Sequence, residues 1–183
     1  MKSFKGHFLI AATALEDPNF NRTVVLMVQH DSEGALGLVL NRPLEMTLRE
    51  LWEQLSTEPC NIDQPLHQGG PCDGPLMALH AHAEAAEMTL MPGVHFSDES
   101  ESIQWLVAHG SSPLRFFAGY SGWSPGQLED ELKQGAWLTT PADASTLFAP
   151  PDKLWPLLQL ALSPASTLLG MNPMNLPDDP SMN

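Results

Sequence analysis

Two apolar segments joined by a short polar turn constrain the fold more than any other feature of this sequence. Thr23–Val28 is a continuous apolar run rich in β-branched residues, which predicts a strand buried on both faces. The turn residues Asp31–Gly34 separate it from a second apolar run at Leu36–Leu40, a pattern typical of an antiparallel hairpin. Asn41-Arg42-Pro43 ends the second arm, because a proline nitrogen cannot donate to a strand ladder. The chain is therefore expected to build a β-sheet around this hairpin.

Four helix signals follow the hairpin. Thr47-Leu48-Arg49-Glu50 has the form of a capping box, and Ser124-Pro125-Gly126-Gln127 combines a serine cap, a proline at the first position and a glutamine that completes a second box. Another helix is expected to open at Asp98 and to end at His109-Gly110. An apolar helix is expected near 152–162. The buried face of the first helix is predicted from helical spacing to be Leu48, Leu51, Trp52 and Leu55.

The remaining pattern defines the fold class and the domain. Further strands are expected at 8–11, 75–80, 87–91, 114–118 and 136–139, and a loop rich in proline and glycine at 58–74. Strands and helices are interspersed without a regular βαβ repeat and the first hairpin is antiparallel, so the pattern favours an α+β fold. The 183 residues fit one domain, with residues 1–170 as the folded unit. Residues 171–183 are rich in proline and lack aromatic side chains, which predicts a loose tail.

Charge and cysteine content narrow the partners and the location. The chain has 22 acidic and 8 basic residues, a formal net charge of −14. Such a surface repels nucleic-acid phosphates and anionic lipids, because binding to either depends on Lys and Arg, so direct nucleic-acid binding is disfavoured. No stretch approaches the roughly 20 apolar residues of a membrane helix. The two cysteines are compatible with a reducing cytoplasm, where we expect the protein to reside.

A series of short motifs resembles one protein family. They are Gly6–Ala11, Asp17–Leu26, Gly34–Pro43, Gly69–Pro71, Phe117–Trp123, Gly126–Glu129 and Ala136–Leu138. Together with His30, and in this order, they resemble the YqgE/AlgH family from residue 6 to about residue 138. The chain departs from the family pattern at Ala12–Ala14, where members usually carry a proline, and at Cys72, where an aliphatic residue usually follows the Gly-Gly-Pro.

The resemblance implies a single α+β domain whose mostly antiparallel sheet curls into an incomplete barrel with helices packed outside. It implies little about activity. The family is bacterial and largely of unknown function, and one branch carries the label of transcriptional regulator. No catalytic residue or cofactor is established for it, so the resemblance assigns none here.

Two glycine-rich loops, at residues 69–71 and 119–126, are candidates for the walls of a binding cleft. Glycine lets a backbone approach a ligand closely, and neighbouring aromatic rings supply flat apolar surface. The candidate ligand- or partner-binding residues are Asn41, Arg42, Gly69, Gly70, Tyr120, Trp123, Gln127 and Trp137. The alternative is that the glycines form tight turns and the aromatic rings fill the core. Arg22 and Arg42 either clamp a carboxylate or phosphate, or are engaged by nearby acids and loop carbonyls.

Catalytic and metal sites receive less support from the sequence. A possible zinc set is Cys60, His67, Cys72, His80 and His82, with His80 and His82 on one side of a strand. Its spacing matches no zinc knuckle, and packed thiols and surface histidines explain the same residues. Gly119-Tyr120-Ser121-Gly122-Trp123 resembles a nucleophile elbow but lacks the final glycine. No phosphate-binding loop, dinucleotide fingerprint or zinc-protease motif occurs, so no catalytic residue or cofactor is assigned.

The leading hypothesis is a non-enzymatic cytoplasmic binding or regulatory protein with a protein or small-molecule partner. It would act through Asn41-Arg42-Pro43 and the two glycine-rich loops. Two alternatives remain open: a transcriptional regulator that binds DNA directly, which the charge argues against, and a metal- or thiol-dependent enzyme that uses the cysteines and histidines.

Overall fold

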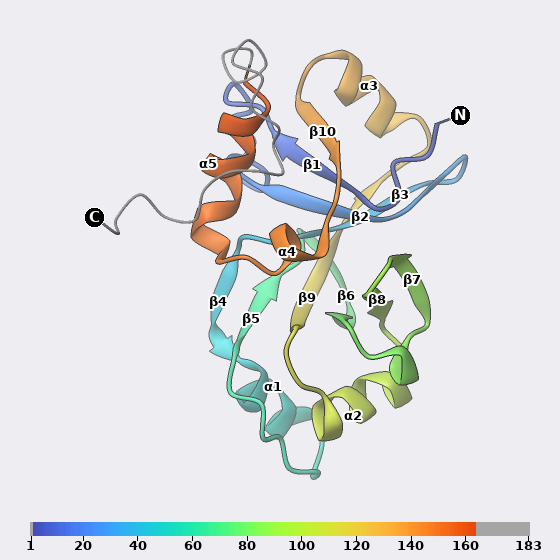
Figure 1. Cartoon of the computed structure of the whole chain (residues 1–183), viewed down its shortest axis with the longest axis vertical. Coiled ribbons are helices and arrows are strands. Elements are labelled where there is room, and N and C mark those ends of the chain that lie inside the picture. Colours follow the sequence, from blue (N-terminus) through green and yellow to red (C-terminus); the bar gives the residue numbers. More distant parts are fainter. Residues whose placement is uncertain (1, 164–183) are drawn as a thin grey trace.

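The computed structural model of the chain describes residues 2–163. Its strands are β1 (His7–Ala11), β2 (Val24–Asp31), β3 (Gly34–Val39), β4 (Pro43–Thr47), β5 (Pro65–Gln68), β6 (Cys72–His80), β7 (Met88–Met91), β8 (Val94–Ser97), β9 (Leu114–Trp123) and β10 (Trp137–Pro141). Its helices are α1 (Leu48–Leu55), α2 (Ser100–His109), α3 (Gln127–Lys133), α4 (Ala144–Leu147) and α5 (Pro151–Ala161), with a short 3-10 helix at Ala83–Ala85. Helices α1 and α2 lie at one end of the molecule, and α3 and α5 near the other (Figure 1).

The sheet confirms the predicted hairpin and the α+β class. Strands β2 and β3 pair antiparallel, and both are largely buried. The main ladder runs β10-β1-β2-β3-β9-β6-β8-β7, and β4 pairs with β5, which joins β9. The β5–β9 pair is parallel and every other pair is antiparallel within the described residues. Strands β10 and β7 lie at the two ends of the ladder and do not pair with each other, so the sheet is not closed.

Strand β9 organises this sheet, and its length corrects one prediction. Residues 119–123 were expected in a loop, but β9 continues through them to Trp123. Its first half pairs with β5 and β6, and its last three residues pair with β3. Gly119, with φ of +75°, lies between the two halves, in a conformation that a side chain disfavours. One strand therefore connects both parts of the sheet.

The prediction for the region between α1 and β6 was also wrong in part. Residues 58–74 were expected as loop, yet β5 and the start of β6 lie within them. Strand β8 and helix α4 were not expected either. All are short, and β5 is recognised only through its pairing with β4 and β9, which the local sequence does not encode. The predicted domain end at residue 170 and the tail 171–183 lie outside the described residues.

The helix starts follow the predictions unevenly. At α1 the capping box is complete: Thr47 N–H donates to Glu50 Oε2 over 2.8 Å and Glu50 N–H to Thr47 Oγ1 over 3.3 Å. Leu55, however, is 63% exposed, because it ends the helix beyond the core. Helix α2 begins after Glu99, not Asp98. The carboxylate of Glu87, before β7, accepts the N–H groups of both Asp98 and Glu99 over 3.0 Å.

Helix α3 was expected to start with Ser124 as cap, but Gly126 is the capping residue, with φ of +79°. Half of the predicted box is present, since Gln127 Oε1 accepts the N–H of Ser124 over 3.0 Å.

The core divides into three clusters: one under α4 and α5, one under α1 and α2, and one between β1–β3 and α3.

Candidate functional site

Asn41 fixes the backbone at the open end of the β2–β3 hairpin, opposite its turn. Its side-chain oxygen accepts the N–H of Val24 over 2.9 Å, and its amide donates to the carbonyl of Arg22 over 2.8 Å. Arg22 has φ of +53°, a left-handed conformation uncommon for a residue with a side chain. Its guanidinium stacks over the Trp155 ring, 5.6 Å from the centroid. Asn41 therefore holds the 17–22 loop against the hairpin. The next residue, Arg42, also contacts this loop.

Arg42 lies at a small cleft beside that loop. Its Nη2 donates to both the backbone oxygen and Oδ1 of Asn21, over 2.8 and 2.9 Å. Part of the guanidinium is therefore engaged by a loop carbonyl, which was one of the two alternatives for Arg42. The Arg42 carbonyl accepts the N–H of Gln68 over 2.8 Å, which ties it to β5. A cavity of about 60 Å³ opens here, called the Arg42 cleft, and it is lined by Pro18, Asn19, Val39, Arg42, Gln68, Gly70 and Pro71.

The two glycine-rich segments do not face each other across this cleft. They pack directly together: a Cβ on Gly69 would lie 2.2 Å from the Gly119 oxygen, and a Cβ on Gly70 2.3 Å from Tyr120 backbone atoms. Ser121 is fully buried, and its Oγ donates to the Gly69 carbonyl over 3.0 Å. These glycines allow close backbone contact, and Ser121 lies inside a strand, not at an exposed elbow. The cleft opens instead between the Gly70-Pro71 turn and the 17–22 loop.

Three of the predicted residues converge on one carboxylate of α3, that of Glu131. Trp123 and Trp137 are 5% and 4% exposed, and both indole N–H groups donate to Glu131. Gln127 also donates to Glu131, over 2.9 Å. Tyr120 lies apart from them, half-buried, with its ring against Gly74. The structure thus brings Trp123, Gln127 and Trp137 together at Glu131, with the two indoles buried and Gln127 exposed to solvent.

Phe20 connects this aromatic group to the cleft, and the sequence analysis missed it. Its ring stacks on Trp123 with centroids 5.9 Å apart and meets Trp137 edge-on at 5.5 Å. Phe20 belongs to the same loop as Pro18, Asn19 and Asn21. The buried tryptophans therefore position the loop that forms one side of the Arg42 cleft. The one signal for it in the sequence is that this aromatic residue lies between two asparagines, Asn19 and Asn21, in a polar turn.

The cysteines and histidines of the possible metal set are dispersed. Cys60 Sγ donates to the Ile62 carbonyl over 3.5 Å, and Cys72 starts β6. His80 ends β6 with Nε2 3.0 Å from Ser97 Oγ, and His82 lies beyond the strand, accepting the Ser111 N–H over 3.0 Å. Across residues 2–163 no group of three or more His, Cys, Asp or Glu side chains is arranged to hold a metal ion.

His67, the fifth member of that set, is buried beside another cationic residue. Neither of its ring nitrogens has a hydrogen-bond partner among the described residues, and its ring packs on Phe117. Burial, with the positive charge of Arg115 second, lowers the pKa of His67 to about 4. Burial likewise lowers the pKa of Arg115 to about 10, and its guanidinium donates to the carbonyls of Leu40, Leu147 and Ala149. Both groups serve the core rather than a surface site.

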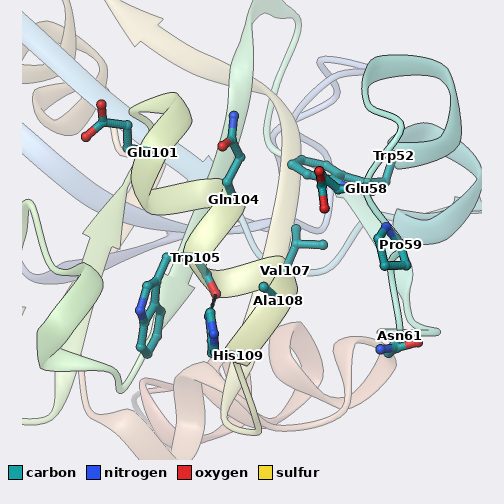
Figure 2. Close-up of a pocket in the computed structure, with 10 residues that line it drawn as sticks. All are labelled: Trp52, Glu58, Pro59, Asn61, Glu101, Gln104, Trp105, Val107, Ala108 and His109. Carbon is teal, nitrogen blue, oxygen red and sulfur yellow. Dashed lines mark hydrogen bonds between the residues drawn. The ribbon is translucent and has the colours of Figure 1, made fainter.

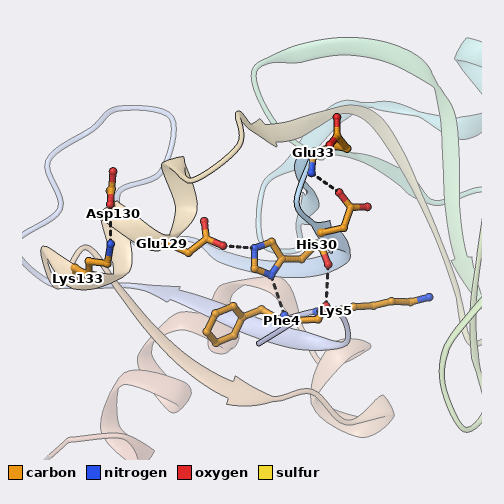
Figure 3. Close-up of polar contacts among 9 residues, drawn as sticks. Phe4, Lys5, His30, Glu33, Glu129, Asp130 and Lys133 are labelled. Atoms are coloured by element: carbon orange, nitrogen blue, oxygen red, sulfur yellow. Dashed lines mark hydrogen bonds and ion pairs between the residues drawn. The ribbon is translucent and has the colours of Figure 1, made fainter. Parts of the chain in front are cut away.

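A further polar contact fixes α3 on the sheet (Figure 3). His30 Nδ1 accepts the N–H of Phe4 over 3.0 Å, so a neutral His30 carries its proton on Nε2 and donates to Glu129 Oε1 over 3.0 Å. This contact joins residues 99 positions apart. The tryptophan pair contacts a different carboxylate of the same helix, Glu131. Helix α3 is therefore held in place by two of its carboxylates, Glu129 and Glu131.

These features define the class of protein: an α+β domain around an open ten-stranded sheet, with a small arginine cleft beside the first hairpin. The chain belongs to the AlgH-like family, which it matches over residues 8–162. No helix in the described part of the chain is long and apolar enough to cross a membrane.

Relatives and solved structures agree with this assignment. The chain is 36% identical over 157 residues to a UPF0301 protein of Chlorobaculum tepidum, covering 82% of each chain. It is 38% identical to a UPF0301 protein of Pseudomonas paraeruginosa, over 92% of this chain and 89% of the relative. The solution structure of the AlgH protein from Pseudomonas aeruginosa is similar with a TM-score of 0.74 and 32% identity, covering 98% of this chain and all of that one. The crystal structure of protein DIP2367 from Corynebacterium diphtheriae shares the fold, with a TM-score of 0.72, 23% identity and 93% coverage of both chains.

Proposed function

We propose that this chain is a non-enzymatic binding or regulatory protein that holds an anionic group of its partner in the Arg42 cleft. The observation that carries this proposal is that Arg42 is held in position but is not neutralised by an acidic side chain within residues 2–163. Asn21 holds its Nη2 at the mouth of the cleft, and Arg42 belongs to none of the ion pairs found in residues 2–163. Its remaining guanidinium N–H groups have no recorded partner in that range.

The lining of the cleft supports a carboxylate or phosphate as the bound group. Asn19 and Gln68, whose side chains carry amides, also line the cleft. A guanidinium presents N–H groups in a fork that matches the oxygens of a carboxylate or phosphate. At about 60 Å³ the cleft admits such a group but not a whole cofactor. The rest of the ligand, whether protein or small molecule, would lie on the surface outside.

The positions of the other cations argue against direct DNA binding. Arg115 is buried, Arg49 lies 3.9 Å from Asp63, and Lys133 pairs with Asp130 over 3.0 Å. Phosphate-backbone binding needs several accessible cations on one surface, and the net charge of −14 opposes it. We therefore propose that any regulatory effect of this protein on transcription is indirect. The free thiols of Cys60 and Cys72 support a cytoplasmic location.

An affinity pull-down from the native host, with nuclease treatment, tests the proposal. Wild type is compared with Arg42→Gln and with Lys133→Gln, which removes the same charge from the exposed face of α3. We expect a protein retained by wild type and Lys133→Gln and lost with Arg42→Gln. Retention of the same proteins by Arg42→Gln would contradict the proposal. If wild type retains none, an NMR titration with N-acetylglutamate and inorganic phosphate must give saturable shifts at Gln68 and Gly70, or the proposal fails.

A further inference from the structure

A second surface, remote in sequence from the Arg42 cleft, forms a long groove along α2. A cavity of about 490 Å³ lies beside the C-terminal half of α2, and one of about 310 Å³ beside its N-terminal half. Both are lined by Trp52 and Gln104, so they adjoin at those side chains. We call them together the α1–α2 groove. It extends from Ser100 to His109, roughly 14 Å at 1.5 Å per helical residue.

The groove has apolar and aromatic walls. Trp52 from α1 lies at its centre, with Val107 on one side and Ile103 on the other, all from the same buried cluster. Figure 2 shows Pro59, on the chain that follows α1, on the same side of α2 as Trp52, with Trp105 on the other side of the helix. Leu55, 63% exposed, lies at the edge of the second cavity. This surface can cover the aliphatic part of a bound side chain.

The titratable residues that line the groove are carboxylates, apart from His109. Glu58 and Glu101 line the larger cavity and Asp98 lines the smaller, and no Lys or Arg lines either. The adjoining outer face of α1 adds Glu50 and Glu53, which line a further shallow depression. Carboxylates beside tryptophan faces favour Lys and Arg, whose charged heads pair with the acids while their stems lie on the rings.

A buried donor provides a second, independent observation. Trp52 is only 5% exposed, and its indole N–H has no acceptor among the described residues. A buried N–H group without an acceptor costs free energy, so such groups are normally paired. Because Trp52 lines both cavities, a segment bound in the groove would lie against this residue, although its indole nitrogen is itself closed to solvent.

We propose that the α1–α2 groove is the docking site for a basic segment of a partner protein, in which Lys or Arg residues alternate with apolar side chains. Nucleic acid does not fit, because its phosphates would meet Glu58, Asp98 and Glu101. A second copy of this chain carries the same charge of −14 and is repelled. The proposal does not depend on the Arg42 cleft, which it leaves free for a separate ligand.

The test measures binding of a fluorescent peptide to the full chain at physiological salt. The probe is a helical peptide of Lys and Leu, about three turns long to match the groove. Glu58→Gln with Glu101→Gln removes two groove charges, and the matched control Glu16→Gln with Glu33→Gln removes two exposed charges elsewhere. We expect at least a tenfold loss of affinity for the groove variant and less than a twofold loss for the control. The Trp52 indole N–H resonance of wild type should shift on saturation.

Two results would overturn this assignment. Equal weakening by both double variants would mean that the peptide follows net charge and not the groove. Binding that persists when every leucine of the probe is replaced by serine, or that leaves the Trp52 resonance unmoved, would show that the apolar walls are not used. Arg42→Gln should bind the peptide as wild type does, so this test separates the groove from the Arg42 cleft.

Discussion

Trp123 and Trp137 share one hydrogen-bond acceptor, since both indole N–H groups donate to Oε2 of Glu131, over 2.9 and 2.8 Å. Their rings also meet edge-on, with centroids 6.2 Å apart and planes at 74°. Trp123 ends β9, Trp137 begins β10, and Glu131 belongs to the helix between them. One carboxylate thus joins α3 to the two strand ends that flank it. Through Phe20 the same group supports the loop at the Arg42 cleft.

Glu131→Ala is expected to lower the free energy of unfolding by roughly 3 kcal/mol, because two buried indole donors lose their acceptor. Glu131→Gln keeps one oxygen for the indoles and should lose less than half as much. Urea denaturation followed by tryptophan fluorescence measures both. An alanine variant within about 0.5 kcal/mol of wild type would show that the shared acceptor does not stabilise the fold.

Thr47→Ala should destabilise the protein by about 1 kcal/mol, the usual contribution of a helix N-cap. Thr47 both accepts from Glu50 N–H and donates to its carboxylate, so alanine removes two contacts of the box. Thr47→Ser keeps the hydroxyl and serves as the matched control. Chemical denaturation should rank alanine below serine, with serine close to wild type; equal values for the two variants would rule out a role for the side-chain cap.

Gly69→Ala is expected to prevent folding or to cost well over 3 kcal/mol, since the new methyl group would lie 2.2 Å from the Gly119 backbone oxygen. Gly126→Ala is the control: it meets no atom within 4 Å and changes only a residue with φ of +79°, at a cost of about 1 kcal/mol. Soluble expression and thermal unfolding distinguish the two. Similar stability of both variants would mean that β9 does not lie against Gly69 as described.

These glycines show how far the sequence predicts the structure. The hairpin, the α1 cap and the α+β class follow from signals within about ten residues, and they are confirmed. Gly69 and Gly70 were singled out, but whether a ligand or another strand approaches them depends on contacts fifty positions away. Phe20 was missed for the same reason, because its partners, Trp123 and Trp137, lie over a hundred residues further along. Local patterns thus identified candidate residues but not what they face.

Two of the buried histidines, His67 and His80, give the protein a predictable sensitivity to acid. Burial lowers the pKa of both His67 and His80 from 6.5 to about 4 in the folded state. As the pH falls below about 6.5 the unfolded chain takes up protons at these histidines, while the folded chain does so only near pH 4. Stability that is fully present above pH 6.5 is therefore lost between these values, by up to about 1.4 kcal/mol per pH unit for each histidine and less where solvent screens the charge.

His67→Phe separates the contribution of one histidine from the other. Phenylalanine has a similar shape, and no well-aligned hydrogen bond to the described residues is lost, since the Phe116 backbone makes only a weak contact with the His67 ring. The variant also ends the repulsion between a protonated His67 and Arg115. We expect the slope of unfolding free energy against pH, measured by urea denaturation from about pH 7.5 to 5, to fall by roughly half. At the upper end of that range the two proteins should differ little in slope, since His67 is neutral in both states there. An unchanged slope below pH 6.5 would mean that His67 is not held neutral by burial, and the acid sensitivity would then have to arise from His80 alone.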